Sequence, residues 1–157
     1  MHKVYFAGAI TGDRSRASIF KDIIQHIQSL DKKVLTEHFQ LQNPNTFLAE
    51  FINKKYEDLL PEDIEKQDTA WINEATHLVA EVSTASTGTG REIEYARSKH
   101  LYGHPEAKIL CLYEEGSRAS AMITGMTPER YPSVRVRAYK NLEHLKEILN
   151  EFFNLTV

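Results

Sequence analysis

Glu92 is the first candidate for chemistry, because its carboxylate follows a loop of small hydroxyl and glycine residues. The stretch 81–92, EVSTASTGTGRE, resembles a phosphate-binding loop but lacks the Gly-Lys-Ser/Thr ending of a P-loop. We expect Glu92 to lie in the first turn of a helix, where the helix N-terminus lowers the pKa of a carboxyl group. An ionised, positioned carboxylate can act as a nucleophile, as in glycosidases. The alternative is a carboxylate that only stabilises the helix terminus.

Asp68 is the second candidate, because it interrupts the apolar stripe of a helix predicted over 61–75. The apolar residues on this face are Ile64, Trp71, Ile72 and Ala75. A buried carboxylate is costly without a partner, so Asp68 either has a partner or a chemical role, or it marks the boundary of the stripe. If this face packs on a sheet, Asp68 could reach Glu92. Two carboxylates in one pocket can divide their roles, one staying charged and the other holding a proton.

Hydroxyl side chains are concentrated in two loops. They are Ser83, Thr84, Ser86, Thr87 and Thr89 in the first loop, and Ser117 and Ser120 in the second. Ser120 could cap a short helix, ASAMIT. Ordinary turn chemistry explains such residues, but together with the N–H groups of a helix start they also suit a phosphate. Tyr5 and His38, near the ends of the first two predicted strands, carry little weight alone.

Five short apolar runs separated by helical patterns must position these residues. The runs cover 3–8, 33–38, 77–82, 107–113 and 133–139, and the helical patterns cover 15–30, 61–75, 90–100 and 141–154. Four runs are nearly continuous, as in strands covered on both faces, while the fifth alternates like an edge strand. Strands alternating with helices predict an α/β fold with right-handed crossovers and a mainly parallel, five-stranded sheet.

The carboxyl ends of parallel strands form the rim at which ligands bind. This rule gathers four segments on one rim: GAITGDR, TEHF, VSTASTGTGRE and YEEGSRASAMITG. The polar stretch 39–60, interrupted by Pro44, is predicted to be a partly helical excursion over the sheet edge and a candidate lid.

Composition excludes several classes of protein. The chain has 157 residues, 41% of them hydrophobic, which fits one domain with a real core. A net charge of −3 gives no basic field for nucleic-acid binding. The single Cys111 in an apolar run indicates a reducing compartment. No apolar run approaches the ~18 residues of a membrane span, and the N-terminus is too quickly broken for a signal peptide. We expect a cytosolic protein, or a nuclear one in a eukaryote, without a metal site.

The order of motifs resembles one known family. VYFAGAITG is followed by VLTEH, then IEKQDTAWINEATHLVAEVSTASTGTGREIEYA, then ILCLY and SAMITG. This order resembles the 2'-deoxynucleoside 5'-phosphate N-hydrolases, within the nucleoside 2-deoxyribosyltransferase superfamily, over nearly the whole chain. The resemblance implies a single Rossmann-like (flavodoxin-like) three-layer sandwich over 1–157. It also implies a homodimer without a cofactor, which releases the free base and 2-deoxyribose 5-phosphate.

The resemblance also implies a role for each matching residue. Glu92 matches the nucleophile that attacks C1', Asp68 the carboxylate that assists the departing base, and Tyr5 a tyrosine that lines the sugar. The expected substrate contacts are Gly8, Ile10, Thr11, His38, Ile64, Ser86, Gly88, Gly90, Ser120 and Met122. Among these, Ser86 and the glycines after it hold the 5'-phosphate, and Ser120 reaches the phosphate of the neighbouring subunit with Met122 beside it. Ile10, His38 and Ile64 surround the base.

Two departures from the family pattern affect the substrate contacts. The family often has Gly-Ser-Ile-Arg where this chain has Gly8, Ala9, Ile10 and Thr11, although Arg14 or Arg16 could replace the arginine. An extra segment, LYGHPE, covers 101–106.

The sequence is also compatible with three other functions. The first is a deoxyribosyltransferase, which would pass the sugar to a second base. The second is a ribonucleotide N-glycosidase, which we disfavour because a tyrosine at position 5 should crowd a 2'-hydroxyl. The third is a non-catalytic nucleotide sensor, which would gain nothing from two neighbouring carboxylates.

Overall fold

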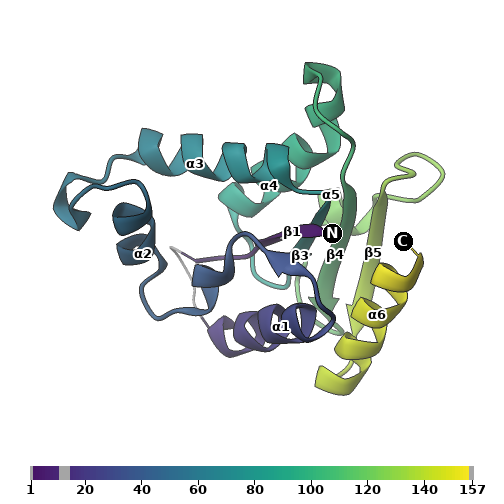
Figure 1. The fold of residues 1–157 in the computed structure, drawn as a ribbon. Coiled ribbons are helices and arrows are strands. Elements are labelled where there is room, and N and C mark those ends of the chain that lie inside the picture. Colours follow the sequence, from purple (N-terminus) through teal and green to yellow (C-terminus); the bar gives the residue numbers. More distant parts are fainter. Residues whose placement is uncertain (1, 11–14, 156–157) are drawn as a thin grey trace.

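The computed structural model describes residues 2–10 and 15–155, and its centre is a five-stranded sheet (Figure 1). The strands are β1 (Lys3–Ala7), β2 (Lys33–Val34), β3 (His77–Glu81), β4 (Lys108–Glu114) and β5 (Val134–Tyr139). Their order is β2-β1-β3-β4-β5, and all neighbours pair in parallel. Four of the predicted strands are confirmed, with β5 at an edge, while β2 is shorter than predicted; the sheet is wholly rather than mainly parallel.

Helices cover both faces of the sheet and complete the predicted three layers. Helices α1 (Ala17–Ser29) and α6 (Leu142–Leu155) lie on one face, and α3 (Pro61–Glu74) and α4 (Thr87–Ser98) lie on the other (Figure 1). This strand order with helices on both faces is the flavodoxin-like arrangement. The predicted α/β class is therefore confirmed.

Local sequence explains where the helices form. In α1, Phe20, Ile23 and Ile27 recur at helical spacing and are buried in the core. Pro61 opens α3, a position at which a missing N–H costs nothing. The Ser86 hydroxyl caps α4 by accepting the N–H of Thr89 at 3.2 Å. The two helices that carry the candidate carboxylates therefore begin at chemically defined residues.

Strand β2 is shorter than the predicted run 33–38, because Thr36 replaces the strand ladder with its side chain. Its hydroxyl accepts the N–H of Phe6 and donates to the carbonyl of the same residue, both at 2.9 Å. With these backbone groups satisfied by a side chain, the main chain turns into the 3-10 helix η1 (Glu37–Gln40). His38 consequently lies in a helical turn.

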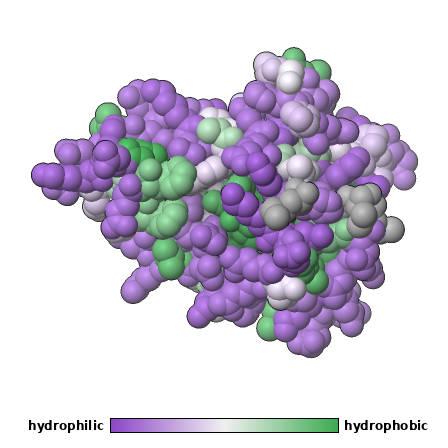
Figure 2. Space-filling model, in the orientation of Figure 1, coloured by the Kyte–Doolittle hydropathy of each residue, from purple (hydrophilic) through white to green (hydrophobic). Residues whose placement is uncertain are grey.

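The excursion 39–60 is partly helical, as predicted. Helix α2 (Pro44–Phe51) and the 3-10 helix η2 (Tyr56–Asp58) follow η1, and α2 lies beyond the sheet on the side away from α6 (Figure 1). Apolar surface gathers over this part of the molecule (Figure 2), where Leu41, Phe51 and Tyr56 are exposed. Its role as a lid stays a prediction.

The remaining elements are two short helical segments. The 3-10 helix η3 (Lys99–Tyr102) follows α4 directly and includes the start of the extra segment 101–106. Helix α5 (Ala121–Thr124) is capped by Ser120, which accepts the N–H of Met122 at 3.3 Å, as predicted. Among the described residues, none of the helices is long and apolar enough to cross a membrane.

Candidate active site

A hydrogen bond between Tyr5 and Glu92 forms the centre of the candidate site. Tyr5 is fully buried in β1, and its hydroxyl donates to Glu92 Oε1 on α4 at 2.6 Å. The two residues are 87 positions apart in the sequence. Burial and the nearby carboxylates raise the pKa of Tyr5 well above its usual value, so the phenol keeps its proton and acts as a donor.

Asp68 lies beside this pair on α3. Asp68 and Glu92 line the same cavity, which has a volume of about 250 Å³. Burial raises the pKa of Asp68 to about 7, the neighbouring Tyr5 hydroxyl opposes the rise, and the charge of Glu65 adds to it. The structure therefore brings together the three side chains that the sequence singled out as catalytic candidates.

The environment of Glu92 differs from the one predicted. Helix α4 begins at Thr87, so Glu92 lies in its second turn and not its first. The pKa of Glu92 is raised to about 8, mainly by desolvation and also by the charge of Asp68, while the Tyr5 hydrogen bond and the charge of Arg91 oppose the rise. The predicted lowering of this pKa was wrong, because the helix-terminus effect fades within the first turn while burial dominates beyond it.

The cavity around the two carboxyl groups contains both predicted and unpredicted residues. Ile64 and Gly88 were predicted, and the residues missed by sequence reasoning are Pro61, Glu65, Thr69, Ile72, Arg91 and Tyr95. Arg91 on α4 and Glu65 on α3 form an exposed ion pair at 2.7 Å. Glu65 could have been predicted to line this cavity, because it lies three residues before Asp68 on the same helix. Arg91 gave no sequence signal, because only the packing of α4 against α3 turns it toward the cavity.

A second cavity, of about 330 Å³, contains four other predicted residues. Ser86, Gly90, Ser120 and Met122 line it, together with an apolar wall that includes Ile93 and other residues. Gly88 belongs to the first cavity and Gly90 to the second, so the first turn of α4 contributes to both. The predicted site residues are thus divided between two hollows that share this turn.

His38 lies in an aromatic cluster rather than on an open surface. It is buried, stacks on Phe47 with ring centroids 4.8 Å apart, and contacts Trp71 at 5.2 Å. Burial lowers the pKa of His38 to about 4, so the ring is neutral at physiological pH. The cluster joins η1, α2 and α3, but the buried Nδ1 atom of His38 has no hydrogen-bond partner among the described residues. A substrate contact of His38 stays a prediction.

The residues predicted after β1 have different surroundings. A Cβ added at Gly8 would lie 2.8 Å from Cζ of Phe20, so close packing of α1 explains this glycine. Ile10 is half-buried against the core. Thr11 and Arg14 lie outside the described residues. Close packing therefore accounts for Gly8 without requiring a substrate contact.

Arg16 is engaged on the opposite side of the sheet from Glu92. Its guanidinium forms an ion pair with Glu114 at 2.7 Å and donates to the Tyr139 hydroxyl at 3.3 Å. Tyr139 in turn donates to the buried Glu81 at 3.0 Å. Arg16 is therefore held in a separate network and is a poor replacement for the family arginine.

The geometry defines a class of chemistry. The described residues contain no group of three or more His, Cys, Asp or Glu side chains that could hold a metal ion. They do place two carboxyl groups with raised pKa values in one cavity, next to a tyrosine donor and a helix start. Such a pair can supply both a nucleophile or base and an acid, as glycosidases require.

Comparison with known proteins identifies the family. No protein-family model matches the chain. A protein of Nematostella vectensis, provisionally named a 2'-deoxynucleoside 5'-phosphate N-hydrolase, is 34% identical over 154 residues, covering 96% of this chain and 93% of the relative. The 5-hydroxymethyl-dUMP N-hydrolase of Esox lucius is 32% identical over 158 residues, covering 98% and 96%. The chain belongs to the 2'-deoxynucleoside 5'-phosphate N-hydrolase family.

A solved structure supports the fold independently. The CMP N-glycosidase of Clostridium botulinum superposes with a TM-score of 0.63, covering 96% of this chain and 98% of that one, at 18% identity. At this identity the match establishes the shared fold.

Proposed function

We propose that the protein hydrolyses the N-glycosidic bond of 2'-deoxynucleoside 5'-monophosphates to the free base and 2-deoxyribose 5-phosphate. The observation that carries the proposal is the contact of Tyr5 with Glu92 in a site that Asp68 shares. The substrate class is supported by the names of relatives that match nearly the whole chain. As a family member with this site, the chain is an N-glycosidase.

The reaction proceeds in two steps. A Glu92 oxygen attacks C1' as the bond from C1' to the base breaks, and the proton held by Asp68 moves to the departing base. Water then attacks C1' of the glycosyl ester, Glu92 leaves as a carboxylate, and the water proton returns to Asp68. Protons and charge balance over the cycle without a cofactor.

The carboxyl pair can hold the single proton that this division of roles requires. With pKa values raised to about 7 for Asp68 and about 8 for Glu92, the pair holds about one proton near neutral pH. The 2.6 Å hydrogen bond from Tyr5 favours the charged form of Glu92. The higher pKa of Glu92, which already includes this hydrogen bond, would place the shared proton on Glu92 in the free protein. In the reactive state we assign the charge to Glu92 and the proton to Asp68, because attack on C1' requires a carboxylate.

The start of α4 is the proposed position of the 5'-phosphate. The hydroxyl of Ser86 accepts the N–H of Thr89, which leaves its own proton free to donate. A Cβ added at Gly90 would meet nothing within 4 Å, so packing does not require a glycine there. Glycine inside a helix costs about 1 kcal/mol relative to alanine. A glycine at position 90 leaves room for a phosphate to approach the backbone, which is a reason for its presence despite this cost.

A homodimer is the proposed active unit, with Ser120 and Met122 completing the neighbouring site. Both residues are exposed, and the Met122 side chain, at 84% exposure, is unusually open for its type. The Ser120 hydroxyl accepts the N–H of Met122 and can still donate to a phosphate.

Complementation tests this arrangement. Ser120→Asp should repel the phosphate, and Glu92→Gln removes the nucleophile, so each variant alone should be inactive. The two variants are then co-expressed. If Ser120 contributes to the active site of the partner subunit, each mixed dimer has one intact site, and activity returns to about a quarter of the wild-type level. If Ser120 serves its own subunit, no activity returns.

Base release is the direct test of the activity. The protein is incubated with dCMP, dGMP, dUMP and 5-hydroxymethyl-dUMP, and with CMP and GMP, and free base is measured by chromatography. Release from deoxynucleotides that Glu92→Gln abolishes is expected. No release from any of them, or full activity of Glu92→Gln, contradicts the proposal. Exchange of bases on unphosphorylated deoxynucleosides would instead indicate a transferase.

A further inference from the structure

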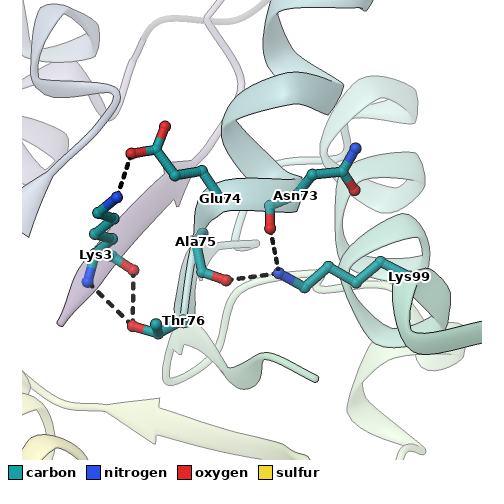
Figure 3. Close-up of polar contacts among 6 residues, drawn as sticks. All are labelled: Lys3, Asn73, Glu74, Ala75, Thr76 and Lys99. Atoms are coloured by element: carbon teal, nitrogen blue, oxygen red, sulfur yellow. Dashed lines mark hydrogen bonds and ion pairs between the residues drawn. The ribbon is translucent and has the colours of Figure 1, made fainter. Parts of the chain in front are cut away.

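Lys99 is a fully buried lysine that the proposed mechanism does not use. It lies where α4 ends and η3 begins, and its side chain has 0% exposure. The ammonium donates to three backbone carbonyls at the end of α3, those of Ile72 at 2.8 Å, Asn73 at 3.2 Å and Ala75 at 2.6 Å. Figure 3 shows the Lys99 side chain reaching from its helix to Asn73 and Ala75.

This contact is a cross-link between two helices. The last carbonyl groups of a helix lack intrahelical partners, and a cation at this end interacts favourably with the helix dipole. Lysine is rarely buried without such compensation. Because the donor belongs to α4 and η3 while the acceptors belong to α3 and its cap, the contact holds the ends of α3 and α4 at a set separation.

The same two helices carry the two candidate carboxylates. Asp68 lies about one turn before the first carbonyl that Lys99 contacts, and Glu92 about two turns before Lys99, which corresponds to ~10 Å along α4. Nearer the carboxylates, α3 and α4 are also joined by the Glu65–Arg91 ion pair, whose side chains are 44% and 59% exposed. Exposed ion pairs of this kind contribute little to the stability of the folded protein. Lys99 is thus a buried polar connection between the helices.

We propose that Lys99 is a positioning residue that sets the separation of the Asp68 and Glu92 carboxyl groups by fixing the ends of α3 and α4. Its effect on turnover rests on the proposed function, but its effect on the carboxyl pair does not. Without Lys99, the unsatisfied carbonyls of Asn73 and Ala75 would draw water between the helices, and the carboxyl pair would become more hydrated and further apart.

The chain offers a matched control in Lys3. Its ammonium forms an ion pair with Glu74 at 2.6 Å, at the same end of α3, with side chains 39% and 43% exposed. Figure 3 shows Lys3 and Lys99 approaching this end of α3 from opposite sides. Lys3→Met therefore removes a lysine contact from the same helix end but leaves the connection to α4 intact.

The first experiment measures the pKa values of the two carboxyl groups and does not require catalysis. Carboxyl carbon-13 NMR titrations give the apparent pKa values of Asp68 and Glu92 in the wild type, Lys99→Met and Lys3→Met. We expect both values to fall by about one pH unit in Lys99→Met, because separation and hydration each favour the charged forms, and to stay unchanged in Lys3→Met. Unchanged values in Lys99→Met overturn the proposal.

The second experiment reads turnover. We expect Lys99→Met to lower kcat about tenfold or more with KM within about threefold, since misplaced catalytic groups affect the chemical step more than binding. The pH–rate profile should move to lower pH, and Lys3→Met should match the wild type. A loss of thermal stability in Lys99→Met, with wild-type kcat and pH profile per folded molecule, would show a purely structural role and overturn the proposal.

A second variant covers the case in which Lys99→Met does not fold. Lys99→Gln keeps an amide donor on a shorter side chain, so it should give shifts between those of the wild type and of Lys99→Met. Wild-type titrations and rates in Lys99→Gln would overturn the proposal. The two experiments also separate the two ideas. If the carboxyl pKa values fall in Lys99→Met while the wild type cleaves no nucleotide, the role of Lys99 is supported and the proposed function is rejected.

Discussion

The two faces of the sheet each contain a tyrosine hydrogen-bonded to a glutamate. On the α3–α4 face, Tyr5 donates to Glu92 at 2.6 Å, and on the α1–α6 face, Tyr139 donates to Glu81 at 3.0 Å. The faces differ because side chains alternate along a strand: Tyr5 aligns with Leu78, and Glu81 is three positions further along β3. The Tyr139–Glu81 pair can therefore be compared directly with the Tyr5–Glu92 pair of the candidate site.

The surroundings of the two glutamates are different. Ser83 also donates to Glu81, and the positive charge of Arg16 lies nearby, so these groups oppose the rise in the pKa of Glu81 that burial causes. Glu92 has a second carboxyl group beside it, which raises its pKa, and it faces a cavity. A buried Tyr–Glu hydrogen bond is therefore no sign of catalysis by itself. The neighbouring carboxyl and the open space distinguish the reactive pair.

Replacing each glutamate should give the largest contrast. Glu92→Gln should lower kcat by about a thousandfold or more, because an amide cannot form the glycosyl ester. Glu81→Gln should keep kcat within about threefold but lower the free energy of unfolding by about 1–2 kcal/mol, because one of its hydrogen bonds is lost. Base-release kinetics and urea unfolding measure the two effects. Equal losses of activity in the two variants would contradict the assignment of the active site to the α3–α4 face.

Removing the second carboxyl group should have the next largest effect. Asp68→Asn cannot donate a carboxylic proton to the leaving base, so kcat should fall about a hundredfold. The loss should be smaller for nucleotides whose bases leave readily as anions. Steady-state rates over a series of bases of increasing acidity measure this trend. A uniform loss for all bases would show that Asp68 does not act as the acid.

The two tyrosines should separate by their effect on pH dependence. Tyr5→Phe removes the hydrogen bond that opposes the rise in the pKa of Glu92, so this pKa should rise further and the activity at neutral pH should fall about tenfold. Tyr139→Phe should leave the pH–rate profile unchanged and cost about 1 kcal/mol of stability. A shifted profile in Tyr139→Phe would show that the two networks are coupled.

The smallest effect concerns stability and pH. A carboxyl group whose pKa is higher in the folded than in the unfolded state stabilises the fold at low pH, and this contribution is lost as pH rises through the folded value. For Asp68 that value is about 7, so part of the free energy of unfolding of the wild type is lost between pH 5 and pH 8. In Asp68→Asn this loss should be smaller by about 1–2 kcal/mol. Urea unfolding at both pH values measures it, and a steeper fall would contradict the raised pKa.

Local sequence patterns predicted most of the fold. Apolar runs and helical periodicity located β1, β3, β4 and β5 and the four main helices, because burial on a strand or helix face repeats with a fixed period. The exception is β2, which the side chain of Thr36 ends by bonding Phe6. A hydroxyl that replaces backbone partners leaves no periodic trace, so its consequence for β2 and η1 was not predictable.

The candidate site was predictable in its members but not in its electrostatics. Glu92 and Asp68 stood out as a carboxylate after a glycine-rich loop and a carboxylate within an apolar stripe. Arg91 and the buried connection through Lys99 did not stand out, because each depends on the packing of α3 against α4.

The sequence by itself determined which groups are present and on which elements they lie, since the periodicity of strands and helices is a local property. Only the tertiary structure decided what these groups do to one another. It joined Tyr5 to Glu92 across 87 positions and raised the pKa of Glu92, where the local pattern indicated a lower value. The reason is physical: desolvation and the field of neighbouring charges depend on distances in space, which the order of residues along the chain does not contain.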